Sequence, residues 1–143
     1  MESPIALMHT NDLPQVLLLA EQLGYPSDIL TIQKRFETLT HSPFHQLIVY
    51  RSENKINGWI HLEVVFDLIE EPKLEIKALV VDEKLRGKGI GSELLKAAKI
   101  WGINNRLHTA YLSCNILRKQ THAFYYREGF ELVKTSHFFE LKI

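Results

Sequence analysis

The sequence has 143 residues, enough for one domain with a single core. Its 17 lysines and arginines balance its 17 aspartates and glutamates, and a net charge of zero argues against a nucleic-acid-binding protein, which usually carries a basic excess. No apolar stretch is long enough to span a bilayer, and Met1–Pro4 lacks the basic and apolar regions of a secretion signal. We therefore expect no membrane association and a single domain over residues 1–143.

Cysteine and histidine usage limits the chemistry further. The single cysteine, Cys114, excludes an internal disulfide and is typical of a reducing cytoplasm, which is the location we expect. The seven histidines are scattered and show neither His-x-x-x-His nor Cys-x-x-Cys spacing, so we expect no metal site.

Hydrophobic periodicity and turn residues predict eleven elements. In chain order these are a strand at Ile5–Met8, a helix capped by Asp12 and ending near Leu23, a helix from Pro26 to about Leu39, strands at Gln46–Arg51, Ile56–Phe66 and Leu74–Val81, a helix from Ile90 to about Asn104, a strand at Thr109–Ser113, a helix from about Leu117 to Arg127, and strands at Phe130–Val133 and His137–Leu141. Strands outnumber helices, and hairpins mix with crossovers. This order predicts an α/β fold with a mixed, mostly antiparallel central sheet flanked by helices.

The most informative segment is Arg86–Gly91, which reads Arg-Gly-Lys-Gly-Ile-Gly. It lies between the apolar run Ala78–Val81 and the start of a helical pattern. The first turn of a helix has backbone N–H groups without internal acceptors and carries the positive end of the helix dipole. Glycines let the backbone come close to a ligand, and Arg86 and Lys88 add positive charge. The segment therefore predicts a phosphate or pyrophosphate site.

Two other phosphate loops do not fit this segment. The dinucleotide fingerprint needs a third glycine where Ser92 stands, and a Walker A loop needs serine or threonine after the lysine, where Gly89 stands. An ordinary surface turn between a strand and a helix is the alternative interpretation.

Two blocks of sequence, in order and on matching elements, resemble the GNAT superfamily of acyl-CoA-dependent N-acetyltransferases. The first is Glu75–Val81 followed by Arg86–Gly91. The second consists of Ser113-Cys114-Asn115, Arg118, His122-Ala123-Phe124-Tyr125 and Gly129-Phe130. The resemblance implies a GNAT-like acyl-CoA N-acyltransferase fold, acetyl-CoA as the co-substrate, and transfer of an acetyl group to a primary amine.

The resemblance also implies the residues that hold the cofactor. In the family, the pantetheine arm pairs with the fourth strand beside a β-bulge, and the pyrophosphate binds the glycine turn. The cofactor-binding residues implied here are Leu79, Val81, Arg86, Gly87, Lys88, Gly89, Ile90, Gly91, Ser92, Asn115 and Arg118.

Acetyl transfer to an amine needs a base, an oxyanion donor and an acid. An alkylamine has a pKa near ~10 and must lose a proton, for which the resemblance nominates Glu75, acting through a water. It nominates the Val81 amide, or that of its neighbour, for the oxyanion and Tyr125 as the acid that protonates the thiolate. The alternatives are a solvated glutamate and a tyrosine that packs in the core. Cys114 is expected to be a small buried residue rather than a nucleophile.

The family places the acceptor against the first two helices and the turn after the third strand. The residues implied are Tyr25, Pro26, Trp59 and His61, with Asp67–Glu71 either drawing in a cationic amine or forming a solvated turn. We expect a small-molecule primary amine; a protein N-terminus or lysine, and a non-catalytic acyl-CoA-binding module, are the alternatives. Phe138 and Phe139 point to opposite sides of a predicted strand, which leaves one available for a homodimer.

Overall fold

The computed structural model describes residues 3–143, and its internal contacts divide the chain into two units that meet between Leu112 and Ser113. Met1 and Glu2, which belong to the segment that lacks the features of a secretion signal, lie outside the described residues. The two units are described separately, and the single domain expected over residues 1–143 stays a prediction.

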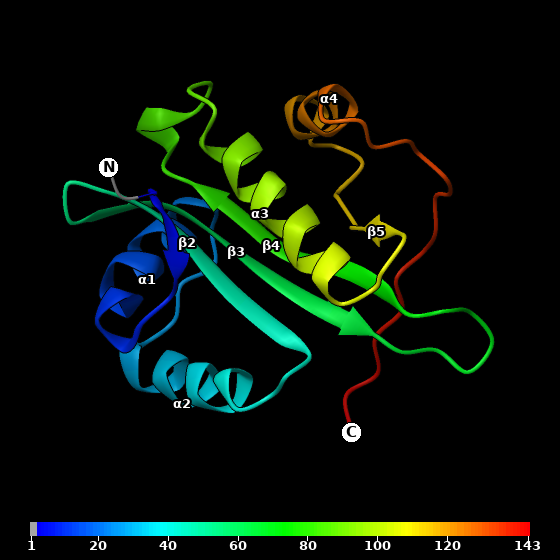
Figure 1. Ribbon diagram of the computed structural model, residues 1–143, viewed down its shortest axis with the longest axis horizontal. Helices are drawn as coiled ribbons and strands as arrows, with labels where there is room; N and C mark the ends of the chain where they lie inside the picture. Colours follow the sequence, from blue (N-terminus) through cyan, green and yellow to red (C-terminus); the bar gives the residue numbers. More distant parts are fainter. Residues whose placement is uncertain (1–2) are drawn as a thin grey trace. The chain divides into compact units, whose positions relative to one another are not determined.

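The first unit is built on a five-stranded sheet (Figure 1). Its strands lie in chain order: β1 (Ile5–Leu7), β2 (His45–Ser52), β3 (Lys55–Val65), β4 (Lys73–Val81) and β5 (Ala110–Tyr111). The first three pairs are antiparallel, and only β4 and β5 run parallel. The expectation of a mixed, mostly antiparallel sheet is confirmed.

Helices cover both faces of this sheet: α1 (Leu13–Gln22) and α2 (Ile29–Thr40) lie on one, and α3 (Ile90–Asn104) lies on the other (Figure 1). Trp59 packs against the buried cluster that α1 contributes to, whereas its neighbour Gly58 contacts α3. Successive residues of a strand point to opposite faces, so these two contacts place the helices on opposite sides of β3.

Close packing fixes α3 against the sheet. A Cβ atom added to Gly58 would lie 3.0 Å from Ile90 Cγ2 and 3.0 Å from the Val80 carbonyl oxygen. Only glycine leaves room for the first turn of α3 to approach β3 this closely. The N-terminus of α3 is therefore held directly beside the ends of β3 and β4.

The start of α1 differs from the prediction. Asp12, expected to cap the helix, instead accepts two hydrogen bonds from Arg51 Nη2, at 2.8 and 2.7 Å, and one from the His9 N–H at 2.8 Å. Its expected partner Gln15 accepts a hydrogen bond from the Ile56 N–H. A charge-assisted pair is stronger than a neutral hydrogen bond. The buried Asp12 carboxylate therefore holds η1 (Thr10–Asp12) to β2 instead of capping α1.

The start of α2 also differs from the prediction. The helix begins at Ile29 rather than at Pro26, because the Asp28 carboxylate accepts a hydrogen bond from the Thr31 N–H at 2.9 Å and so caps the helix. Asp28 and Thr31 are the N-cap signal that marks this start in the sequence.

The second unit contains α4 (Lys119–Arg127), which ends before Gly129, a residue with φ of 95°. The strands predicted at Phe130–Val133 and His137–Leu141 are wrong, because residues 130–143 form no regular element. Apolar alternation alone does not make a strand; a ladder of backbone hydrogen bonds to a partner is also needed. The side chains of Phe138 and Phe139 are 90% and 89% exposed.

Candidate active site

The turn between β4 and α3 has the backbone shape that its glycines predict. Gly87 and Gly89 have φ values of 80° and 86°, in the left-handed region that L side chains rarely adopt. A Cβ at either position would meet no atom within 4 Å. Conformation rather than space therefore explains why glycine occupies both positions, and the space beside them is open.

This turn presents hydrogen-bond donors and positive charge. Glu93 is the first residue of α3 whose N–H has an acceptor within the helix, the Gly89 carbonyl oxygen at 3.0 Å. The N–H groups of Ile90 and Gly91 come before it and have no intrahelical acceptor. Arg86 and Lys88 are exposed and have no ion-pair partner among residues 3–143. Such a turn has the chemistry to bind a diphosphate.

The end of α1 anchors the beginning of this turn. Gln22 Oε1 accepts a hydrogen bond from the Glu83 N–H at 2.9 Å, and its Nε2 lies 3.4 Å from Asp82 Oδ1. The buried Asp82 carboxylate also accepts a hydrogen bond from the Lys84 N–H and so caps η2 (Glu83–Leu85). No local pattern in the sequence marks Gln22, because its partners lie about sixty residues away in the chain.

One edge of β4 is open. Strand β5 pairs with β4 only at Leu74 and Glu75, so the edge from Ile76 to Val81 has no strand partner in the first unit. The pairing of β4 with β3 also shifts by one residue, because His61 opposes Ala78 while Leu62 opposes Ile76. Lys77 is thus the extra residue of a bulge. The open edge contains the predicted pantetheine contacts Leu79 and Val81 and leads to the glycine turn.

Glu75 belongs to a charged cluster on the sheet. Lys77 Nζ lies 3.5 Å from Glu75 Oε1 and 3.4 Å from Glu63 Oε2, between the two carboxylates. Burial opposes the charge of Lys77, but the two carboxylates raise its pKa above the ordinary value. Burial and the charge of Glu75 likewise raise the pKa of Tyr111. The predicted base is therefore half-buried and already paired with a cation.

His61 lies in a row of three polar side chains, with His45 and Glu63, that the sequence alone does not bring together. Its Nε2 lies 2.9 Å from His45 Nδ1, and His45 Nε2 lies 3.7 Å from Glu63 Oε1. Burial, together with the nearby His45 and Lys77, lowers the pKa of His61 to about 4. His61 is therefore a neutral imidazole at neutral pH. His45 and Glu63 come together only through the antiparallel register of β2 and β3.

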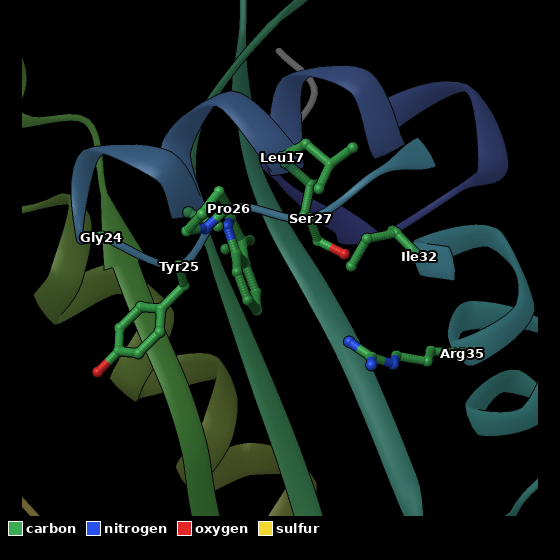
Figure 2. A pocket seen from close by; sticks show the side chains of 10 residues that line it. Leu17, Gly24, Tyr25, Pro26, Ser27, Ile32 and Arg35 are labelled. Carbon is green, nitrogen blue, oxygen red and sulfur yellow. The ribbon is translucent and has the colours of Figure 1, made fainter. Parts of the chain in front are cut away.

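A cavity of about 450 Å³ lies between α1, α2 and β3 (Figure 2). Tyr25 and Trp59, both predicted to contact the acceptor, line it, whereas His61 does not. Figure 2 shows Arg35 reaching toward the cavity from α2 and Tyr25 on the opposite rim. The full lining is Val16, Leu17, Ala20, Gly24, Tyr25, Pro26, Ser27, Ile32, Arg35 and Trp59.

The acidic turn after β3 is occupied by local contacts. Asp67 Oδ1 accepts hydrogen bonds from the Ile69 and Glu70 N–H groups, and Glu70 pairs with Lys73 at 2.8 Å. The Ile69 side chain is almost fully exposed. These contacts favour the interpretation of Asp67–Glu71 as a solvated turn.

Three predicted site residues lie in the second unit. Asn115 Oδ1 accepts a hydrogen bond from the Leu117 N–H at 2.8 Å, and Arg118 directly precedes α4. Burial, and to a smaller extent Cys114, raises the pKa of Tyr125 to about 12, so its phenol stays protonated at neutral pH. The Tyr125 ring packs edge-on against Phe124 and Phe130. Burial also raises the pKa of Cys114, which disfavours its nucleophilic thiolate.

Membrane-spanning helices and metal-binding clusters are both absent from residues 3–143. Within that range, none of the helices is both long and apolar enough to cross a bilayer. The same residues contain no group of three or more histidine, cysteine or acidic side chains arranged to hold a metal ion.

The fold and the glycine turn together are those of an N-acetyltransferase. The model of the Acetyltransferase (GNAT) family matches residues 14–130, and the chain belongs to this family. Aminoalkylphosphonate N-acetyltransferase of Salmonella typhimurium (strain LT2) is 39% identical over 85 residues. That match covers 59% of this chain and 53% of the relative, about half its length.

Solved structures support the same fold. Aminoglycoside 6'-N-acetyltransferase AAC(6')-Ig from Acinetobacter haemolyticus has a TM-score of 0.86 at 16% identity, with 100% of this chain and 99% of that chain covered. AAC(6')-Iy in complex with a bisubstrate analogue has a TM-score of 0.87 at 15% identity, with 97% of each chain covered. At these identities the likeness shows the fold alone.

Proposed function

We propose that this protein is an N-acetyltransferase that moves the acetyl group of acetyl-CoA to the primary amine of a small molecule by direct attack in a ternary complex. One observation carries the proposal: the open edge of β4 leads to a cationic turn at the N-terminus of α3. An extended pantetheine arm has free backbone groups to pair with along Ile76–Val81, and the diphosphate meets the turn at its end.

A small-molecule acceptor is favoured over a protein acceptor. The cavity between α1, α2 and β3 has about the volume of a small ligand. The Salmonella relative, which matches over about half its length, is named for acetylating aminoalkylphosphonates, which are small amines.

The proposed chemistry uses three groups. Glu75, acting through a water, takes a proton from the acceptor ammonium, and the free amine attacks the thioester carbon. The Val81 N–H stabilises the resulting oxyanion. The C–S bond then breaks, and the protonated phenol of Tyr125 donates its proton to the departing thiolate. The second proton of the acylated nitrogen passes to the resulting phenolate, which leaves a neutral amide, free CoA with a protonated thiol, and Tyr125 as it began. Asn115 and Arg118 bind the cofactor in this proposal.

The test is release of free CoA from acetyl-CoA in the presence of small primary amines or of peptides with free N-termini and lysines. We expect saturable release with a small amine and an acetylated amine by mass spectrometry. Glu75→Gln and Tyr125→Phe should each lower kcat by at least tenfold. Turnover of peptides alone would contradict the small-molecule acceptor, and binding of acetyl-CoA without any release would favour a non-catalytic module. Unchanged rates in both variants would refute the assigned base and acid.

We also infer a cytoplasmic location and a homodimer. The location is supported by the single cysteine, which is free. The dimer is supported by the exposed rings of Phe138 and Phe139, which a second copy would cover. Sedimentation velocity should show a dimer that Phe138→Ser weakens; a monomer at high concentration contradicts it.

A further inference from the structure

The cavity between α1, α2 and β3 offers hydrogen-bond donors and no acidic side chain. Arg35 is its only charged lining residue, and Ser27 adds a hydroxyl. Neither side chain has a hydrogen-bond or ion-pair partner within residues 3–143. Figure 2 shows the Ser27 hydroxyl and the Arg35 guanidinium on the same side of the cavity. A cationic group gains nothing here, whereas an anionic group meets a full positive charge.

Trp59 provides a second, independent observation. It lines the same cavity, and its indole Nε1 is buried without an acceptor in the described residues. An indole N–H can only donate, and a buried donor without an acceptor is costly. Buried donors of this kind are almost always satisfied in native proteins, and an oxygen supplied by a ligand would satisfy this one.

We propose that this cavity seats an anionic group of the acceptor, a phosphonate, phosphate, sulfonate or carboxylate carried on the same small molecule as the reacting amine. The proposal rests on the proposed function and deepens it by naming the substrate class. Arg35 pairs with the anion, and the Trp59 N–H and the Ser27 hydroxyl donate to its remaining oxygens. The rest of the lining is mostly apolar, so these donors are the polar groups that can hold the anion.

The register of the strands relates the cavity to the open edge of β4. His61 lies two residues beyond Trp59 on the same face of β3, about 7 Å along the strand. It opposes Ala78, beside the bulge at Lys77 and within the open part of β4. An acceptor whose anion lies at Trp59 therefore reaches the open part of β4 by extending its amine along β3 toward His61.

The test compares 2-aminoethylphosphonate with n-propylamine in the CoA-release assay. n-Propylamine is an amine of similar length that has no anionic group. The wild-type protein should give at least a tenfold higher kcat/KM with the phosphonate. Arg35→Gln should abolish this preference by raising KM for the phosphonate tenfold or more, with less than a twofold change for propylamine. Trp59→Phe, which keeps the ring but removes the N–H, should raise the same KM several-fold. Lys34→Gln is the matched control: it removes the neighbouring charge on α2, which does not line this cavity, and both acceptors should be unaffected.

A binding measurement separates this proposal from the proposed function. Methylphosphonate has no amine and cannot be acetylated. In a Trp101→Phe background, where Trp59 is the only tryptophan, it should change the fluorescence saturably, and Arg35→Gln should weaken that binding at least tenfold. If acetyl transfer fails but methylphosphonate binds in this way, the anion site stands and the proposed function falls. If transfer succeeds but propylamine is used as well as the phosphonate and Arg35→Gln changes nothing, the anion site is refuted. Failure of both measurements refutes both.

Discussion

His61 illustrates how the environment of one residue sets its chemistry. The sequence places it on the same face of β3 as Trp59, which predicts a contact with substrate but says nothing of its charge. The structure gives it a half-buried imidazole partner, His45, at 2.9 Å and the cation Lys77 nearby. Both the burial and the positive neighbour oppose protonation, so His61 is held neutral well below its ordinary pKa.

The lowered pKa of His61 predicts a loss of stability in mild acid. In the unfolded chain His61 takes up a proton near its ordinary pKa of 6.5, whereas in the folded protein it does so only near a pKa of about 4. The unfolded state therefore binds more protons between these values, so the contribution is fully present above pH 6.5 and is lost as pH falls toward 4. Between pH 7 and pH 5 the loss amounts to about 2 kcal/mol.

Urea unfolding at pH 7 and pH 5 measures this effect. Between pH 7 and pH 5, the free energy of unfolding should fall by about 2 kcal/mol more in the wild-type protein than in His61→Gln. His108→Gln, which removes an exposed histidine, should behave as the wild type does. An identical pH dependence in His61→Gln and the wild type would show that His61 is not held neutral.

At the scale of elements, local signals predicted the first unit well. The pattern of β4, the glycine turn and α3 could be read from the sequence because each signal lies within a few residues: apolar runs, glycines with positive φ, and helical spacing. The antiparallel pairing of β2 with β3 and of β3 with β4 is typical of strands joined by short connections, whereas two helices separate β1 from β2 in the chain. These elements place the predicted phosphate turn at the end of the open edge of β4.

The features that the sequence could not supply all depend on distant partners. Asp12 has the right neighbours for a helix cap, but Arg51 takes its carboxylate. Gln22 reaches the turn after β4, and Arg35 and Trp59 line one cavity only because α2 packs beside α1 and β2 on the same face of the sheet. Residues 130–143 show the opposite failure, since their alternating apolar side chains suggested strands that lack a pairing partner. Periodicity reports which face is apolar, but it does not report what lies against that face.

At the scale of the molecule, the proposed function gives the two faces of the sheet in the first unit different tasks. On one face α3 points its N-terminus and the charges of Arg86 and Lys88 toward the end of β4, which suits a diphosphate. On the other face α1 and α2 enclose the cavity with Arg35 and Trp59, which suits the acceptor. The open edge of β4 adjoins both faces, so a donor lying along it can meet an acceptor held by the cavity. This division depends on the glycine turn being a coenzyme A site.

The most direct test is isothermal titration of acetyl-CoA into the wild-type protein and into Gly89→Glu and Gly24→Ala. The wild type should bind one acetyl-CoA per chain, and Gly89→Glu should lose this binding, because its side chain adds bulk and negative charge where the diphosphate sits and strains a backbone with φ of 86°. Gly24→Ala has a similar φ of 83° in the turn after α1 and controls for backbone strain; it should keep the wild-type affinity. Absence of heat and of any thermal shift with the wild-type protein, or full affinity in Gly89→Glu, would contradict the account.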